Sequence, residues 1–191
     1  MRKSIFPIIA VLVAALVLLF IPTEAEGAIY EDTVRLHILA NSDTEEDQEL
    51  KLAVRDAVLR EFSAELGGSG SKETAEKKIK ALLPEIEALA EKVVKENGYT
   101  YGVRVSVGEE WYSTRKYEDF TLPAGTYTSL VIEIGEGDGR NWWCVMYPPL
   151  CLGASVEDAS AAYSDEEVRL IRNEGVKVKF KALELISRYF G

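Results

Sequence analysis

Residues 34–43 of the chain read VRLHILANSD, and this stretch decides how the rest of the sequence is interpreted. The apolar residues of its first half alternate with Arg35 and His37, which is the period of a half-buried β-strand. Ser42, with Glu45 three residues later, matches a capping box and predicts that a helix begins directly after the strand. A strand that turns at once into a helix indicates a mixed α and β domain.

Two helices are predicted after this strand. Apolar residues follow one helical stripe over residues 50–66, and a second stripe runs through residues 72–97. Residues 67–71 read GGSGS and predict a flexible loop between the two helices. Pro84 lies within the second stripe, where it must kink the helix or split it in two, because proline lacks a backbone N–H and clashes with the preceding turn.

The second half of the sequence is rich in strand formers. Alternating patterns predict strands at residues 103–107, 127–134 and 142–147, and a glycine-rich turn at 135–140 allows the last two to form a hairpin. Residues 165–171 are helical in pattern. The fold class that follows is α+β: a small mixed or antiparallel sheet, covered by helices on one face, in the order strand, helix, helix, strands, helix.

The N-terminus has the composition of an export segment. Arg2 and Lys3 precede an apolar run from Ile5 to Ile21, and small residues follow it, as in a secretory signal peptide. We therefore predict a signal peptide over residues 1–27 and a single α+β domain over residues 28–191. The run is close to the shortest that spans a bilayer, so an uncleaved anchor helix is the alternative. Either version places the domain outside the cytoplasm.

Charge and composition exclude several classes of function. The net charge is −10, which disfavours binding to nucleic acid or to anionic lipid. One histidine is too few for a histidine-rich metal site, and two cysteines are too few for a disulfide scaffold. Residues 135–139 read GEGDG, which fits a turn with positive φ better than a phosphate loop, and Glu136 with Asp138 offers too few ligands for calcium. No cofactor, metal or catalytic residue is predicted.

Cys144 and Cys151 are separated by six residues that include Pro148 and Pro149. This spacing is not that of a redox motif, but outside the cytoplasm it allows a disulfide, and the prolines provide a turn that brings the sulfurs together. Two buried free thiols are the alternative. A cysteine nucleophile paired with His37 is disfavoured, because no basic residue lies directly beside Cys144 to lower its pKa.

Trp142 and Trp143 stand side by side in the last predicted strand. Adjacent side chains of a strand point to opposite faces, so one tryptophan is expected in the core and the other outward or beneath a helix. An outward tryptophan is a candidate contact for a partner protein. In the alternative interpretation the terminal helix covers both indoles.

Several segments together resemble the stage II sporulation protein R family. They are residues 35–43, 47–48, 54–58, 83–88, 123–127 and 135–151. The segments extend through nearly the whole predicted domain, and the last, with its paired tryptophans, two cysteines and two prolines, is the most specific.

The resemblance implies a signalling protein of endospore-forming bacteria. Members of the family are made in the forespore and secreted into the space between the forespore and mother-cell membranes. There they activate a membrane-embedded aspartic protease of the mother cell, which then cleaves the precursor of the sigma-E factor. The family is not known as an enzyme and supplies no catalytic residues or cofactors to carry over.

Two other functions are compatible with the sequence: an extracytoplasmic thiol-dependent hydrolase that uses Cys144, and a membrane-anchored interaction domain. For the signalling function, the candidate partner contacts are Arg35, His37, Asn41, Asp43, Trp142 and Trp143. Membrane contact is expected only through the N-terminal segment.

Overall fold

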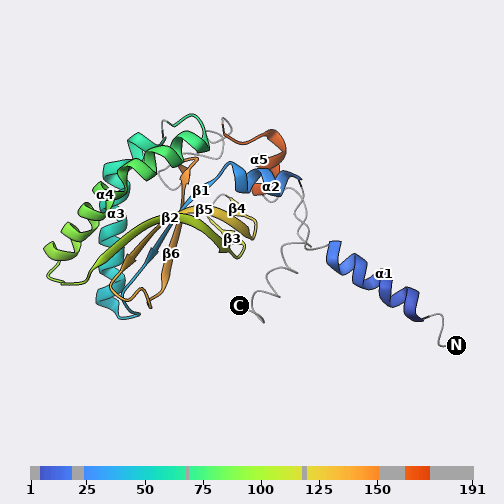
Figure 1. Ribbon diagram of the computed structural model, residues 1–191, viewed down its shortest axis with the longest axis horizontal. Helices are drawn as coiled ribbons and strands as arrows, with labels where there is room; N and C mark the ends of the chain where they lie inside the picture. Colours follow the sequence, from blue (N-terminus) through green and yellow to red (C-terminus); the bar gives the residue numbers. More distant parts are fainter. Residues whose placement is uncertain (1–4, 19–23, 68, 118–119, 151–161, 173–191) are drawn as a thin grey trace.

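The structure is a computed structural model that describes residues 5–18, 24–67, 69–117, 120–150 and 162–172. Its helices are α1 (Ile5–Leu18), α2 (Glu24–Glu31), α3 (Glu45–Gly67), α4 (Lys72–Glu96) and α5 (Asp165–Ile171). Its strands are β1 (Val34–Leu39), β2 (Val103–Tyr112), β3 (Arg115–Lys116), β4 (Thr121–Leu122), β5 (Gly125–Ile134) and β6 (Asn141–Tyr147). Figure 1 shows α3 and α4 on one side of a twisted sheet, with α2 and α5 near its other end.

The main sheet is mixed, with the strand order β2-β5-β1-β6. β1 is parallel to β5 and antiparallel to β6, whereas β2 is antiparallel to β5. The predicted hairpin of β5 and β6 is therefore wrong, because β1 lies between these two strands. The loop at residues 135–140 crosses the end of β1, where the backbone N–H of Gly139 donates to the carbonyl of Ala40 at 2.9 Å.

The central position of β1 explains a second difference from the sequence prediction. A half-buried strand was expected, but every residue from Val34 to Ile38 is buried. Strands pair with both edges of β1, and side chains cover both of its faces, so Arg35 and His37 are enclosed as well. Alternation of apolar and polar residues shows that the two faces of a strand differ, but it does not show that the polar face is exposed. In β1 the polar face is buried beneath a second core.

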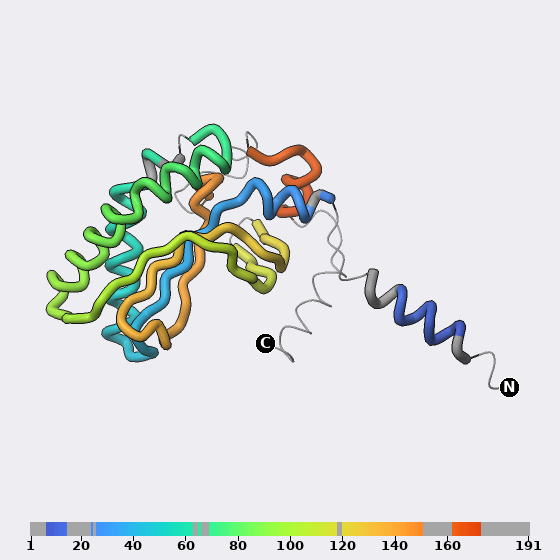
Figure 2. Tube along the Cα trace, in the orientation of Figure 1, coloured from blue at the N-terminus to red at the C-terminus, as the bar shows by residue number. Residues whose placement is uncertain are grey.

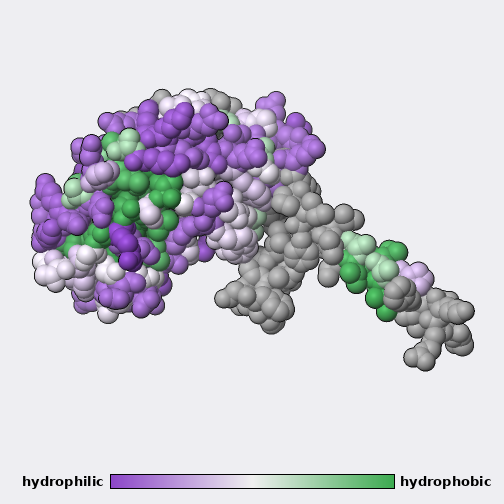
Figure 3. Space-filling model, viewed as in Figure 1, coloured by the Kyte–Doolittle hydropathy of each residue, from purple (hydrophilic) through white to green (hydrophobic). Residues whose placement is uncertain are grey.

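The first face of the sheet packs against α3 and α4. Its core combines alternate residues of β1, β5 and β6 with the apolar stripes of the two helices, for example Leu36, Ile132, Val54 and Ile86, all with no exposed surface. Figure 3 shows hydrophobic residues in the region between the helices and the sheet, and hydrophilic residues over the outer surface of the helices. This arrangement confirms the predicted layer of helices.

α4 is one continuous helix, and Pro84 lies inside it. The alternative of two shorter helices is therefore wrong. Ile79 and Ile86, on either side of the proline, are both fully buried against the same core, so packing holds the two halves together. Figure 2 traces the helix without interruption. Ser71 is its N-cap and Asn97 its C-cap, and Gly98 follows at φ 85°.

The N-terminal cap of α3 lies two residues later than predicted. The side chain of Thr44 accepts a hydrogen bond from the backbone N–H of Asp47 at 3.3 Å, so Thr44 and not Ser42 is the cap. The Ser42 hydroxyl instead donates to the Asp47 carboxylate at 2.5 Å. Glu45 is the first residue of the helix, where the negative charge of an acidic side chain interacts favourably with the positive end of the helix dipole.

The second face of the sheet is also covered, which the prediction of helices on one face did not include. The β3–β4 ribbon, α2 and α5 form a smaller core with Tyr127 of β5 and Val145 of β6. In α2, Ile29 is fully buried and the Tyr30 hydroxyl donates to the carbonyl of Ala124 at 2.8 Å. This second core brings several tyrosines and charged residues over the middle of the sheet.

The predicted signal peptide overlaps α1 and the start of α2. Over the described ranges, no helix combines the length and the apolar character that a membrane span requires. The division at residues 27 and 28 stays a prediction.

Candidate functional site

The structure brings three of the candidate contact residues together on the second face of the sheet. Arg35 and His37 project from β1 to the same side, and Trp143 of β6 stacks on the His37 ring, with the ring centroids 5.7 Å apart. Trp142 faces the other way and packs against the first core, beneath the guanidinium of Arg55. The prediction that the two tryptophans point to opposite faces is confirmed.

Arg35 is the centre of this arrangement. Its side chain has no exposed surface, and its guanidinium lies over the Tyr112 ring, with 3.9 Å from Cζ to the ring centroid. A second ring, that of Tyr127, lies at 5.1 Å. The Nη2 atom donates to the Tyr117 hydroxyl at 2.6 Å. A buried cation is thus held by aromatic faces and one neutral hydroxyl.

His37 connects this centre to the edge strand β2. Its Nδ1 lies 2.8 Å from the Oε2 atom of Glu110, so the ring donates its Nδ1 hydrogen to the carboxylate. The Tyr112 hydroxyl donates to the same oxygen at 3.0 Å. Burial raises the pKa of the Glu110 carboxyl, but the contact with His37, the hydrogen bond from Tyr112 and the charge of Arg35 together outweigh this effect, and the pKa lies below its ordinary value.

Arg115 of β3 completes the group, which the sequence analysis missed. Its guanidinium lies 3.5 Å from the centroid of the Trp143 ring. Burial, and then the positive charge of Arg35, lower the pKa of the Arg115 guanidinium. Sequence offers one signal for this residue, its place in the polar run Ser113-Thr114-Arg115-Lys116 directly after β2, but nothing local places it over β6.

We name this group the Arg35 cluster. It consists of Arg35, His37, Glu110, Tyr112, Arg115, Tyr117 and Trp143, and Thr114 is counted with it as the residue directly before Arg115 in the sequence. Among the described residues, seven buried side-chain polar atoms lack a hydrogen-bond partner; four of them lie on Arg35, His37 and Arg115, and a fifth is the Thr114 hydroxyl beside Arg115 in the sequence. Because buried polar groups are almost always hydrogen-bonded, the concentration of such atoms marks this part of the second face as the candidate site.

Asn41 and Asp43 occupy a different place, the turn between β1 and α3. The Asn41 Oδ1 atom accepts the backbone N–H of Glu136 at 3.1 Å, and the Asp43 carboxylate accepts that of Arg140 at 2.6 Å. Both side chains therefore hold the β5–β6 loop. Asp43 is exposed as well, so a contact with a partner protein stays a prediction for it.

The cysteines lie apart from the cluster. Cys144 is fully buried on the first face, in the core beneath the helices, whereas Cys151 lies outside the described residues. The Cys144–Cys151 disulfide therefore stays a prediction. The burial of Cys144 argues against the thiol-dependent hydrolase, because a nucleophile must reach its substrate.

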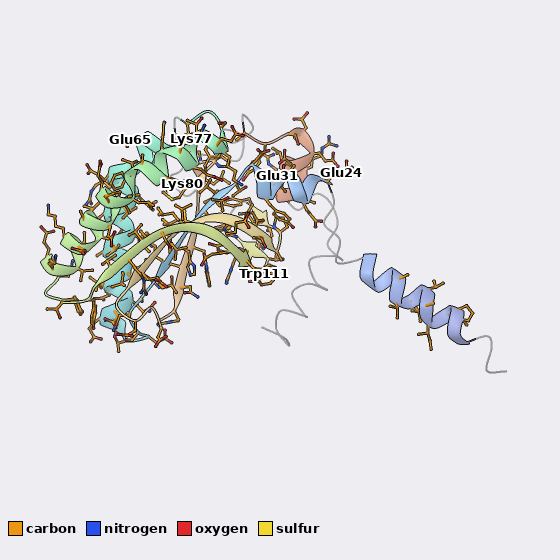
Figure 4. The ribbon with its side chains drawn as sticks, in the orientation of Figure 1. Glu24, Glu31, Glu65, Lys77, Lys80 and Trp111 are labelled. Atoms are coloured by element: carbon orange, nitrogen blue, oxygen red, sulfur yellow. The ribbon has the colours of Figure 1, made fainter. Side chains whose placement is uncertain are left out.

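One exposed residue was also missed. Trp111, near the end of β2, is 57% exposed and projects from the strand (Figure 4). Within the described ranges, no group of three or more histidine, cysteine, aspartate or glutamate residues is placed to hold a metal ion.

Comparison with known proteins identifies the family. The family model described as stage II sporulation protein R matches residues 30–157, which include the whole main sheet. The stage II sporulation protein R of Bacillus subtilis (strain 168) is 34% identical over 186 residues, covering 85% of this chain and 83% of that protein. No solved structure matches the chain. The family is named for a stage of sporulation and is not an enzyme family. The chain is a member of the stage II sporulation protein R family.

Proposed function

We propose that the chain is a secreted signal of sporulation that activates a membrane-embedded aspartic protease of the mother cell. The protease then cleaves the sigma-E precursor. The observation that carries this proposal is the family match, which extends over the folded domain from residue 30 to residue 157. The signal is made in the forespore and acts in the space between the two membranes, on the extracytoplasmic face of the protease.

The physical requirement for such an activator is a stable surface and not a catalytic centre. Binding shifts the protease toward its active state only by as much as the activator prefers that state. In this domain a hydrophobic core packs against each face of the sheet, and such a domain presents a stable surface for binding.

The N-terminal segment, with two basic residues before an apolar run, supports the export part of this proposal. Cleavage before Ala28 would divide α2 and leave Ile29 and Tyr30 on the mature domain. These are the residues by which α2 packs on the second core, since Ile29 is fully buried and the Tyr30 ring contacts Tyr127 with centroids 5.0 Å apart. The mature domain thus keeps these two residues of α2, while Glu26, which is also buried, would be removed with the leader.

The test is to produce this chain, the protease and the sigma-E precursor together in a non-sporulating bacterium. Precursor cleavage is expected only when all three are present. A matched variant that lacks the apolar run Ile5–Ile21 stays in the cytoplasm and should not activate. Equal cleavage without the chain would end the activator proposal, and equal cleavage with the cytoplasmic variant would end the export part alone.

N-terminal sequencing of the exported protein separates the two versions of the leader. A start near Ala28 indicates a cleaved signal peptide, and an intact N-terminus in the membrane fraction indicates an anchor.

A further inference from the structure

The Arg35 cluster holds two arginines that form no ion pair with a carboxylate of the described residues. No ion pair joins Arg35 or Arg115 to an acidic side chain among the described residues, although the chain as a whole carries a net charge of −10. The one carboxylate in the cluster, that of Glu110, is already bound by His37. Buried charges in proteins are normally paired, so this cluster has an excess of positive charge that needs an anion.

The tyrosine rings do not meet this need. A ring face attracts the guanidinium through its π-electrons, as the 3.9 Å contact of Arg35 with Tyr112 shows. The N–H groups of a guanidinium, however, point outward in its own plane, and they require oxygen acceptors. The Tyr117 hydroxyl satisfies one of them, while Nε and Nη1 of Arg35 have no acceptor among the described residues.

Neighbouring residues leave further groups without a partner. These are Nε of Arg115, Oγ1 of Thr114 and Nε2 of His37. An N–H of each arginine and the Thr114 hydroxyl can all donate to an oxygen anion. The cluster therefore lacks one kind of group, an acceptor with negative charge.

We propose that the Arg35 cluster is a binding site for a carboxylate group, with Arg35 as its floor and Arg115 and Thr114 as its rim. A monovalent, planar anion matches the planar guanidinium, and it balances a cluster in which two arginines face one glutamate. Arg115, Thr114 and Trp143 are each only partly buried, so the anion enters from their side. This proposal does not depend on the proposed function.

The test uses the full-length chain in a neutral detergent, with sodium acetate as the probe. The Nε–H signals of Arg35 and Arg115 are followed by ¹⁵N NMR while acetate replaces chloride at constant ionic strength. Saturable shifts of both signals are expected. Shifts that chloride reproduces, or that do not saturate, would overturn the proposal.

Two variants separate a bound carboxylate from general attraction. Arg115→Gln should weaken acetate binding about tenfold or more, since it removes a charge-assisted hydrogen bond. Arg104→Gln is the matched control: it removes the same charge from an exposed side chain that pairs with Glu133, and it should leave acetate binding unchanged. Equal weakening by both variants would mean that no built site exists.

Thr114→Val adds a readout that a structural role would not give. The Thr114 hydroxyl is buried without a partner, so its removal should not lower the melting temperature of the acetate-free protein. Acetate binding should nevertheless weaken at least threefold. A loss of stability with unchanged binding would show that the hydroxyl serves the fold and would contradict its place in the site.

The source of the carboxylate is resolved by a second pair of probes. A blocked Gly-Glu-Gly peptide tests whether a protein side chain reaches the cluster, and the blocked Gly-Gln-Gly peptide is its neutral control. Saturable shifts with the glutamate peptide assign the site to a partner protein, whereas shifts with acetate alone assign it to a small free acid.

Discussion

Nδ1 of His37 lies 2.8 Å from Oε2 of Glu110, so the central strand β1 is tied to the edge strand β2 across the strand between them, β5. Backbone pairing alone holds β2 to β5 only. The side-chain pair thus adds a connection that spans three strands on the second face.

This pair predicts how stability depends on pH. The pKa of Glu110 is lowered in the folded protein, so its contribution is fully present above its ordinary pKa, near 4.5, and is lost as the pH falls through the lower folded value. Glu110→Gln should lower the free energy of unfolding by about 1 kcal/mol at pH 6, and the gap to wild type should narrow toward pH 3. Urea unfolding across this range measures it.

The neighbouring Glu109 supplies the control, since it is exposed and lies on the same strand. Glu109→Gln should show no such narrowing. An equal pH dependence in both variants would contradict the importance of the His37 contact.

Gly139 should not tolerate a side chain. A Cβ at this position would collide with the backbone carbonyl of Ser42 and lie 2.9 Å from the Cβ of Ala40. Because the clash is with backbone, Gly139→Ala should reduce the free energy of unfolding by about 2 kcal/mol or more. Gly108→Ala on β2 meets nothing within 4 Å and serves as the control in the same denaturant titration. Similar losses in both would argue against the close approach of the two loops.

Trp142 and Trp111 should respond differently to the same substitution. Trp142→Ala removes an indole from the first core and should cost about 3 kcal/mol, whereas Trp111→Ala removes an exposed side chain and should change the free energy of unfolding by less than about 0.5 kcal/mol. Thermal unfolding of the two variants checks this difference. A large loss from Trp111→Ala would show that its ring is packed.

Pro84→Ala should stabilise the protein. Pro84 is exposed within α4, and alanine at this position restores a backbone N–H and removes the clash of the ring with the preceding turn. A gain of about 1–3 kcal/mol in the free energy of unfolding is expected, measured by denaturant titration. The control is Ala88→Gly in the same helix, which should destabilise by about 1 kcal/mol. A loss of stability from Pro84→Ala would mean that the proline sets the course of the helix.

Local patterns predicted most of the elements but not their neighbours. The helix at residues 165–171 coincides with α5, because its Ser164 cap and acidic first turn are local signals. The predicted hairpin was wrong because a glycine-rich turn between two strands has the same sequence whether or not a third strand lies between them. That choice depends on the burial of β1, which no short window contains.

The candidate site was only partly predictable for the same reason. Alternation placed Arg35 and His37 on one face, as the structure has them. It could not show that Tyr112, Arg115 and Tyr117, far along the chain, cover that face and bury Arg35 completely. Whether a charged side chain is buried depends on residues that are distant in sequence. The local pattern therefore pointed to the paired tryptophans, although the unpartnered polar atoms of the site lie mainly on the two arginines.

The position of β1 also has a consequence for the order in which the chain folds. Val34 pairs with Thr128 and with Tyr147, so the first strand to be synthesised finds both of its neighbours only near the end of the domain. Such long-range pairing makes folding slow, because the entropy of closing long loops is lost before the strand contacts that compensate for it can form. On the proposal that the chain is exported unfolded, this topology postpones closure of the sheet until β6 has left the translocation channel.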